Sequence, residues 1–388
     1  MSSELFSPGP QRLRSVDVFR GCVVIAMMMV DWTGSWDTRY EIFNHAKWLG
    51  ITPPDFIFPA LIFIAGVAIP LSLGRARREG ADRATYLRIV RRSCLLFVLG
   101  LLLNLFWDWV PGFAIWDKTR LMGVLQRYAL VYPLAALLYL KLRPRTIVFV
   151  GAGILIAYWA ALTLIPVPGF GPPDLSVVGE GAQVTPNLAT WVDKTVLGTR
   201  AGAFYPHDPE GLLPTLTALV TALIGVLAGI WLKEEIPAEA KVNRLFVWGV
   251  ALAVGGYLWG WGFPLSKKLW TSSFVLLMGG WDLLLLAAFI WLIDVKQRDR
   301  FTALPAAYGS NALAAIMLFT FIDNLLRVIP LGHRPDGSIW GVKDFLYERL
   351  LASWLPPKDA AWVYSVVGIL LLGLLMRGLQ RRRIFIRV

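Results

Sequence analysis

The sequence predicts an all-α fold, a polytopic transmembrane helical bundle that forms a single domain over residues 1–388. The chain is 56% hydrophobic with a mean hydropathy of +0.59, and only 16% of its residues are charged, whereas soluble domains carry about 25% charge. Runs of about 20 apolar residues, long enough to cross a bilayer, recur along its length. The 18 Trp and 11 Tyr also suit a membrane protein, because their rings favour the interface with water.

About ten apolar segments are candidate spanning helices, and the charges between them predict their orientation. If the N-terminus lies inside, the inner connections are short and rich in Arg and Lys, whereas the outer connections are longer and less basic. The positive-inside rule then places both termini of this multi-pass protein in the cytoplasm. The segments are 16–33, 55–74, 92–110, 121–140, 146–166, 212–232, 244–262, 271–294, 303–326 and 360–377.

The net charge of +12 is explained by these inner connections and predicts no nucleic-acid partner. Two isolated cysteines, Cys22 and Cys94, and the lack of a His/Cys cluster predict no metal site. The most basic inner connection is either a topology signal or a receptor for a phosphate-bearing cosubstrate from the cytoplasm. It contains Arg75, Arg77, Arg78, Arg83, Arg88, Arg91 and Arg92.

The first outer connection is the leading candidate for chemistry. It holds His45, one of only three histidines, and it is bounded by Asp31 and Asp55. A neutral imidazole can take a proton from an amine or a thiol, or attack an acyl group itself. Considered alone, a single loop histidine is more often incidental. Asp55 follows two prolines and also fits an ordinary helix cap.

A second polar cluster lies where the fourth span begins. Lys118 and Arg120 stand at its outer mouth, and Gln126 and Arg127 fall inside its apolar run. A guanidinium nearly two turns into a membrane helix requires an anionic or carbonyl partner. The structural alternative is an ion pair between Arg127 and an acid such as Asp31.

Two later outer segments add polar groups on the same predicted side of the membrane. The segment HDPEG follows a loop rich in Pro and Gly, and SKKLW precedes the eighth span. Polar groups from four connections then converge at one end of the bundle. The candidates from these two segments are Asp208, Glu210, Lys268 and Trp270.

Five motifs together resemble the heparan-α-glucosaminide N-acetyltransferase family of membrane acyltransferases, over essentially all spans. They are RLRSVDVFRG, FNHAKWLGITPPDFIFP, WDKTRLMGVLQR, HDPEGLL and KKLWTSSF, in this order. The resemblance implies that cytoplasmic acetyl-CoA is the cosubstrate. It also implies a multi-pass protein of the bacterial inner membrane. The acceptor is then the amine of glucosamine, or of a glucosamine-terminated sugar, on the periplasmic side.

The resemblance also implies residue roles. The family's catalytic histidine falls on His45, and direct transfer with His45 as general base is favoured over an acetyl-histidine intermediate, because it needs one barrier and one ternary complex. Asp31 joins it as the second catalytic residue. The residues expected to bind substrate or cosubstrate are Asp55, Lys118, Arg120, Gln126, Arg127, Asp208, Glu210, Lys268, Trp270 and Asn311.

The chain departs from the animal members of the family at two places. Asp31 stands where they have Asn, and an ionised Asp cannot donate a hydrogen bond to an acyl carbonyl. Asp31 would instead orient His45 or bind the ammonium of the sugar. The segment 309–324 keeps Asn311 but lacks the late histidine of the animal enzyme.

Two other classes of function remain open at the sequence level. Helices interrupted by Pro and Gly would also serve an amino-sugar transporter or permease, although no inverted repeat is visible. An O-acyltransferase that modifies a surface polysaccharide would likewise act on the outer side. Membrane lipid is an expected partner, and a homodimer is a possible assembly.

Overall fold

The computed structural model describes residues 13–107, 119–176, 186–204, 206–333, 337 and 339–386. The predicted all-α class is confirmed, since the one sheet in this part of the chain is an antiparallel hairpin of β1 (Pro330–His333) and β2 (Ile339–Gly341). The α-helices are α1 (Arg14–Asp31), α2 (Ile57–Glu79), α3 (Arg83–Trp107), α4 (Val124–Lys141), α5 (Pro144–Leu164), α6 (Leu188–Val196), α7 (Pro214–Leu232), α8 (Ala238–Trp259), α9 (Ser272–Phe289), α10 (Ala303–Ser310), α11 (Ala312–Val328), α12 (Val342–Asp344) and α13 (Pro357–Arg381).

Each of the ten predicted segments overlaps one α-helix of the described residues, or two in the case of the ninth, and the protein is a multi-pass membrane protein. In the described residues, six helices are long and apolar enough to cross a membrane, or seven if α10 and α11 count as one bent span. The count of ten spans therefore stays a prediction. The six carry the bounds Pro53–Glu79, Pro144–Leu164, Pro214–Leu232, Ala238–Trp259, Ser272–Val295 and Pro357–Arg381.

The basic residues assigned to the second inner connection lie largely on helices. Arg75, Arg77 and Arg78 occupy the last turns of α2, and α3 begins at Arg83, so that only a short turn joins the two helices. The third segment thus starts earlier than its apolar run predicts. Arginine is a good helix former, and its long stem lets the charged head reach water.

The ninth segment differs from the continuous span that hydropathy predicts. It breaks at Asn311 into α10 and α11, whose axes differ by 88°. The Asn311 side chain bonds the C-terminal tail, because its Nδ2 donates to the Ile384 carbonyl (3.1 Å) and its Oδ1 accepts from the Ile386 amide (2.9 Å). A tertiary hydrogen-bond pair therefore fixes a kink that composition does not indicate.

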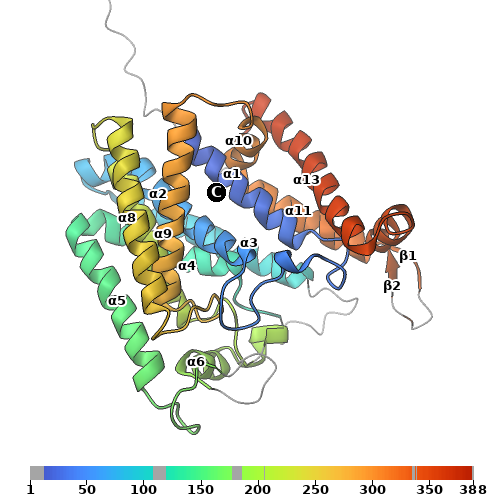
Figure 1. The fold of residues 1–388 in the computed structure, drawn as a ribbon, viewed down its shortest axis with the longest axis horizontal. Helices are drawn as coiled ribbons and strands as arrows, with labels where there is room; N and C mark the ends of the chain where they lie inside the picture. Colours follow the sequence, from blue (N-terminus) through green and yellow to red (C-terminus); the bar gives the residue numbers. More distant parts are fainter. Residues whose placement is uncertain are drawn as a thin grey trace, which may run out of the picture.

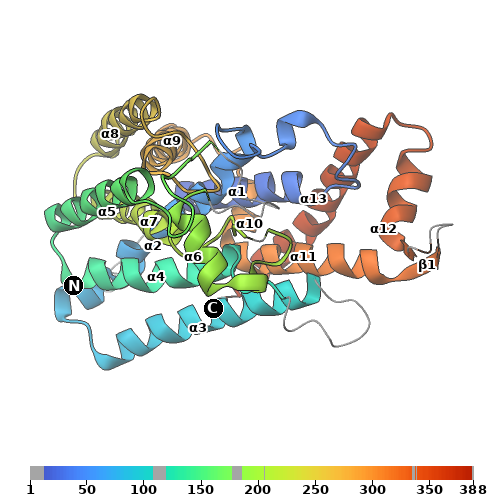
Figure 2. The same cartoon turned by 90° about the horizontal axis from the view of Figure 1, so that it is seen from below.

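Helix α1 lies in the middle of the bundle and contacts α2, α9, α10, α11 and α13 (Figure 1). Helices α3 and α4 run side by side (Figure 2), and α8 packs along α9. Small residues permit the closest approach, as is usual between membrane helices. A Cβ added at Gly66 of α2 would lie 2.0 Å from the Ala222 carbonyl oxygen of α7.

The two ends of the bundle differ in what they carry. At one end Arg14, at the start of α1, donates to Asp299 (3.1 Å), and the C-terminal tail is bonded to Asn311. The opposite end collects the connections predicted to lie outside. There the Gly50 amide donates to the Leu265 carbonyl (2.8 Å) and Ser266 donates to the Trp48 carbonyl (2.7 Å), so that two distant connections form one cap.

Candidate active site

A cavity of about 270 Å³ lies beneath this cap, between α1, α2 and α4. Its apolar floor comes from Met27 and Leu61, and its polar wall comes from four connections far apart in sequence. Its volume lies near the lower end of the roughly 300–1,000 Å³ range of ligand pockets, which suits a small ligand. The polar residues on the wall are Asp31, His45, Arg120, Glu210, Lys267 and Lys268.

His45 forms a hydrogen-bonded pair with Asp55 on this wall. The Nδ1 atom of His45 lies 2.7 Å from Oδ1 of Asp55, and the imidazole is 33% exposed while the carboxylate is fully buried. Because a carboxylate accepts, the pair assigns the hydrogen to Nδ1 and leaves Nε2 with a lone pair. Asp55 also closes a capping box, since its Oδ2 accepts from the Thr52 amide (2.9 Å). Its second oxygen thus caps a helix while the first holds His45.

Lys267 is the cation nearest to this pair. Its Nζ lies 3.1 Å from Nδ1 and 3.4 Å from Nε2 of His45, and 3.8 Å from Oδ1 of Asp55. Burial lowers the pKa of Lys267, although the charges of Asp55, Glu210 and Asp31 oppose that shift. Sequence reasoning chose the neighbouring Lys268, which also lines the cavity.

Asp31 faces the cavity from the last turn of α1. No group in the described part of the chain donates a hydrogen bond to its carboxylate, while His45, Lys267 and Arg39 act on it through their charges. The structure does not place Asp31 behind His45, because Asp55 occupies that position. Asp31 is therefore available to a cationic ligand.

The HDPEG segment folds against Arg120 as an ion-pair network. The Arg120 guanidinium donates from Nε to Oδ2 of Asp208 (2.9 Å) and from its terminal nitrogen to Asp208 and Glu210. Burial alone would lower the pKa of Arg120, but the two carboxylates raise it above its usual value. Burial alone would raise the pKa of Glu210, but the positive charge of Arg120 outweighs the effect of burial and lowers this pKa to about 2. Both groups are charged at neutral pH.

Arg127 is buried within α4, and its hydrogen-bond partners are backbone carbonyls and not Asp31. It donates to the carbonyl oxygens of Pro209 (3.0 Å) and Gly211 (3.4 Å), and its guanidinium lies 4.8 Å from the centre of the Trp270 ring. Two of its nitrogens, Nε and one terminal nitrogen, lack a partner in the described residues. Arg127 and Trp270 stand one layer behind the cavity wall and support the loop that carries Glu210.

A second histidine–aspartate pair lies under the same loop. His207 is fully buried, with Nε2 3.2 Å from the Lys268 carbonyl and Nδ1 3.5 Å from Oδ2 of Asp193. The same carboxylate accepts from the amides of Leu212 (3.0 Å) and Asp208 (3.2 Å). Burial raises the pKa of Asp193 to about 7 and lowers the pKa of His207 to about 3. The sequence does not predict Asp193 as a site residue, because no motif surrounds it.

Three of the remaining predicted residues lie away from the cavity. Gln126 faces α3, where its side-chain oxygen would lie 2.6 Å from a Cβ added at Gly100. Asn311 lies at the opposite end of the bundle, in the kink described above. Asp208 is buried beneath Arg120. Lys118 lies outside the described residues.

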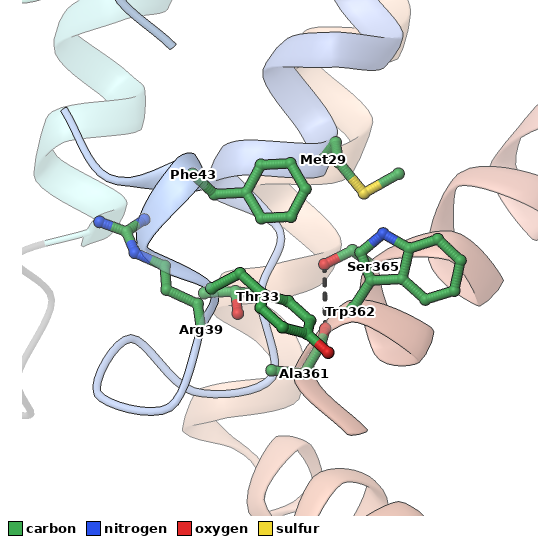
Figure 3. A pocket seen from close by; sticks show the side chains of 8 residues that line it. Met29, Thr33, Arg39, Phe43, Ala361, Trp362 and Ser365 are labelled. Carbon is green, nitrogen blue, oxygen red and sulfur yellow. Dashed lines mark hydrogen bonds between the residues drawn. The ribbon is translucent and has the colours of Figure 1, made fainter. Parts of the chain in front are cut away.

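A smaller pocket lies beside the cavity end, between the end of α1, the first outer connection and α13 (Figure 3). Its volume is about 10 Å³, enough for about one water molecule. Ser365, on its wall, donates to the Ala361 carbonyl within α13 (3.1 Å). The space excludes a sugar or a thioester, so the larger cavity is the candidate active site.

The fold and the cavity define a class: a polytopic membrane protein with a histidine–carboxylate pair in a polar cavity at one end of its helices. The chain belongs to the heparan-alpha-glucosaminide N-acetyltransferase family, since the family model for the catalytic region of that enzyme matches residues 12–234. It is 30% identical over 365 residues to the human heparan-alpha-glucosaminide N-acetyltransferase and 28% identical over 361 residues to the mouse enzyme. Each alignment covers 81% of this chain and 54% of the relative, so the chain spans about half the length of these relatives. The resemblance seen in the motifs is confirmed.

Proposed function

We propose that the protein is a transmembrane N-acetyltransferase. It moves the acetyl group of cytoplasmic acetyl-CoA to the amine of glucosamine, or of a glucosamine-terminated sugar, on the periplasmic side. The observation that carries the proposal is the His45–Asp55 pair on the wall of a cavity that also presents the carboxylate of Asp31, to which no group of the described residues donates a hydrogen bond. Membership of an acetyltransferase family supports the reaction class.

The geometry supports a role for His45 as general base. Its Nδ1–H donates to Asp55, which fixes the ring and stabilises the positive charge that protonation of Nε2 creates. The exposed face of the ring lies on the cavity. A base in this position contributes typically 10²–10⁴-fold to the rate of a proton-transfer step.

The carboxylates supply the affinity for the acceptor. Asp31 binds the ammonium form of the amino sugar, and proton release to the solvent then gives the reactive amine next to His45. Glu210 and Arg120 offer hydrogen bonds to sugar hydroxyls from the same polar wall. The cavity volume suits one sugar ring at the reaction centre, with further sugars extending into the solvent.

The charge distribution supports the proposed orientation. The basic ends of α2 and α3 and both ends of the described chain lie opposite the cavity. With those basic segments in the cytoplasm, the acceptor meets the cavity from outside. The thioester of acetyl-CoA then has to reach it between the helices.

The test uses purified protein with acetyl-CoA and glucosamine, and measures free CoA and N-acetylglucosamine. We expect both products from the wild type and a loss of about 10²–10⁴-fold in kcat for His45→Ala. His333→Ala is the matched control, since His333 is exposed on the β1 strand, and it should behave as wild type. A wild type that releases no CoA would overturn the proposal, as would a His45→Ala variant with full activity.

A further inference from the structure

We propose that Lys267 is a catalytic residue that stabilises the negative charge developing on the acetyl carbonyl oxygen during transfer. The inference rests on the proposed function and adds a role that the family relationship does not assign. It starts from the donors that the cavity offers, because Asp31, in the carboxylate form that the proposed function uses to bind the ammonium of the sugar, cannot donate a hydrogen bond to a carbonyl.

The reaction requires such a group. The lone pair of the amine nitrogen forms a bond to the thioester carbon, and the electrons of the C=O π bond move to the oxygen. His45 takes the proton from the nitrogen. When the carbonyl re-forms, the C–S bond breaks and the sulfur leaves with the proton that His45 returns, giving an acetamide and the free thiol. The intermediate carries a full charge on oxygen, and a donor beside the base stabilises it most.

Lys267 has the required position. Its ammonium lies within 3.4 Å of both ring nitrogens of His45, so a carbonyl whose attacking amine contacts Nε2 comes within reach of Nζ. Of the other cations on the wall, Arg120 is engaged by Asp208 and Glu210. Asp55 lies 3.8 Å from Nζ and limits the cost of keeping this ammonium charged.

The backbone around Lys267 is fixed, which electrostatic stabilisation demands, because a donor that must reorganise during the reaction loses its advantage. Trp270 adopts φ +48°, a left-handed conformation that is uncommon outside glycine. The turn is held on both sides, since Ser266 donates to the Trp48 carbonyl (2.7 Å) and Thr217 donates to the Trp270 carbonyl (2.7 Å). Strain of this kind concentrates at functional sites.

The test replaces the charge and keeps the length of the side chain. We expect Lys267→Met to lower kcat by about 10²–10³-fold, the usual effect of removing one oxyanion donor, with little change in KM for glucosamine. Lys267→Arg keeps a charge and should retain more activity than Lys267→Met. Lys47→Ala, an exposed lysine on the same cap, serves as control.

A second variant separates charge from packing. Alkylation of Lys267→Cys with 2-bromoethylamine rebuilds a lysine-like side chain in which a sulfur atom replaces the γ-methylene group, and it should restore activity. Alkylation with iodoacetamide, which adds an uncharged amide, should not. Wild type treated in the same way controls for Cys22 and Cys94. If the wild type is active and Lys267→Met retains wild-type kcat, or if both reagents restore Lys267→Cys equally, the role of Lys267 is overturned while the proposed function stands. An inactive wild type would instead overturn the proposed function.

Discussion

The cap contains two histidine–aspartate pairs that consist of the same residue types but differ in their surroundings and in their expected roles. In one, His45 is 33% exposed and bonds Asp55 at 2.7 Å, leaving Nε2 on a cavity. In the other, His207 is fully buried, both of its nitrogens face protein atoms, and Asp193 lies 3.5 Å away. The comparison teaches that access, and not composition, separates a candidate base from a structural element.

The electrostatics sharpen the same contrast. Asp55 stays ionised beside Lys267 and can stabilise an imidazolium. Asp193 has a pKa raised to about 7 and His207 has a pKa lowered to about 3, both mainly by burial. The buried pair is therefore neutral between about pH 3 and pH 7. A protonated Asp193 supplies the hydrogen that Nδ1 of His207, the acceptor of the pair, otherwise lacks.

The largest effect expected within this comparison is that of Asp55→Asn. The amide keeps an oxygen for the capping amides but can donate from its nitrogen to Nδ1, which favours the wrong tautomer of His45. A hydrogen bond to a charged group contributes about 1.5–3 kcal/mol, so kcat should fall about 10- to 100-fold, as measured by CoA release.

Asp37→Asn is the control for this variant, because Asp37 is an exposed acid in the same connection. Asp55 would be only a helix cap if Asp55→Asn lowered the unfolding midpoint and left kcat at the wild-type value.

The variant His207→Ala should show the reverse pattern. It leaves the Lys268 carbonyl without its donor and removes the ring that packs edge-on against Trp48, with ring centres 5.0 Å apart. An orphaned buried group costs about 1–3 kcal/mol. We expect a lower thermal midpoint in detergent and a much smaller loss of kcat than for His45→Ala. Wild-type stability together with a collapsed kcat would give the buried pair a catalytic role.

The sequence predicts the helices and the convergence of the site, because both depend on patterns along the chain. Apolar runs locate α1, α2 and α7 within a few residues. Alternating loop charge assigns Asp31, His45, Arg120, Glu210 and Lys268 to one side, and the structure gathers all five on one cavity wall.

What the sequence leaves open depends on which way a residue faces and on tertiary contacts. Gln126 and Arg127 are neighbours in an apolar run, yet one faces α3 and the other supports the HDPEG loop. Lys267 and Lys268 are adjacent residues of the same type, so the sequence does not tell which of them contacts His45. The conformation of the turn that ends at Trp270 places the ammonium of Lys267 next to His45. The break at Asn311 depends on a tail 73 residues away.

The smallest expected effect is a pH dependence of stability, and the buried pair predicts its sign. Asp193 has a folded pKa of about 7 against 3.8 in the unfolded chain, so the folded state holds the extra proton between these values, and stability falls as the pH rises through this window. His207 has a folded pKa of about 3 against 6.5, so here the unfolded state holds the extra proton, and stability rises between pH 3 and 6.5. In the wild type the two contributions oppose each other where the windows overlap.

Replacing one residue of the buried pair should reveal the contribution of the other residue to the pH dependence of stability. The thermal midpoint of Asp193→Asn relative to wild type should rise with pH between about 4 and 7, because the opposing contribution of Asp193 is gone. The midpoint of His207→Ala relative to wild type should fall over the same range, by a few degrees at most. Both curves are measured on detergent-solubilised protein at stepped pH. Two flat difference curves would mean that neither group changes its proton affinity on folding, and the neutral buried pair would then be wrong. Because His45 and Asp55 are intact in both variants, kcat at a fixed pH reports separately whether the cavity pair is disturbed.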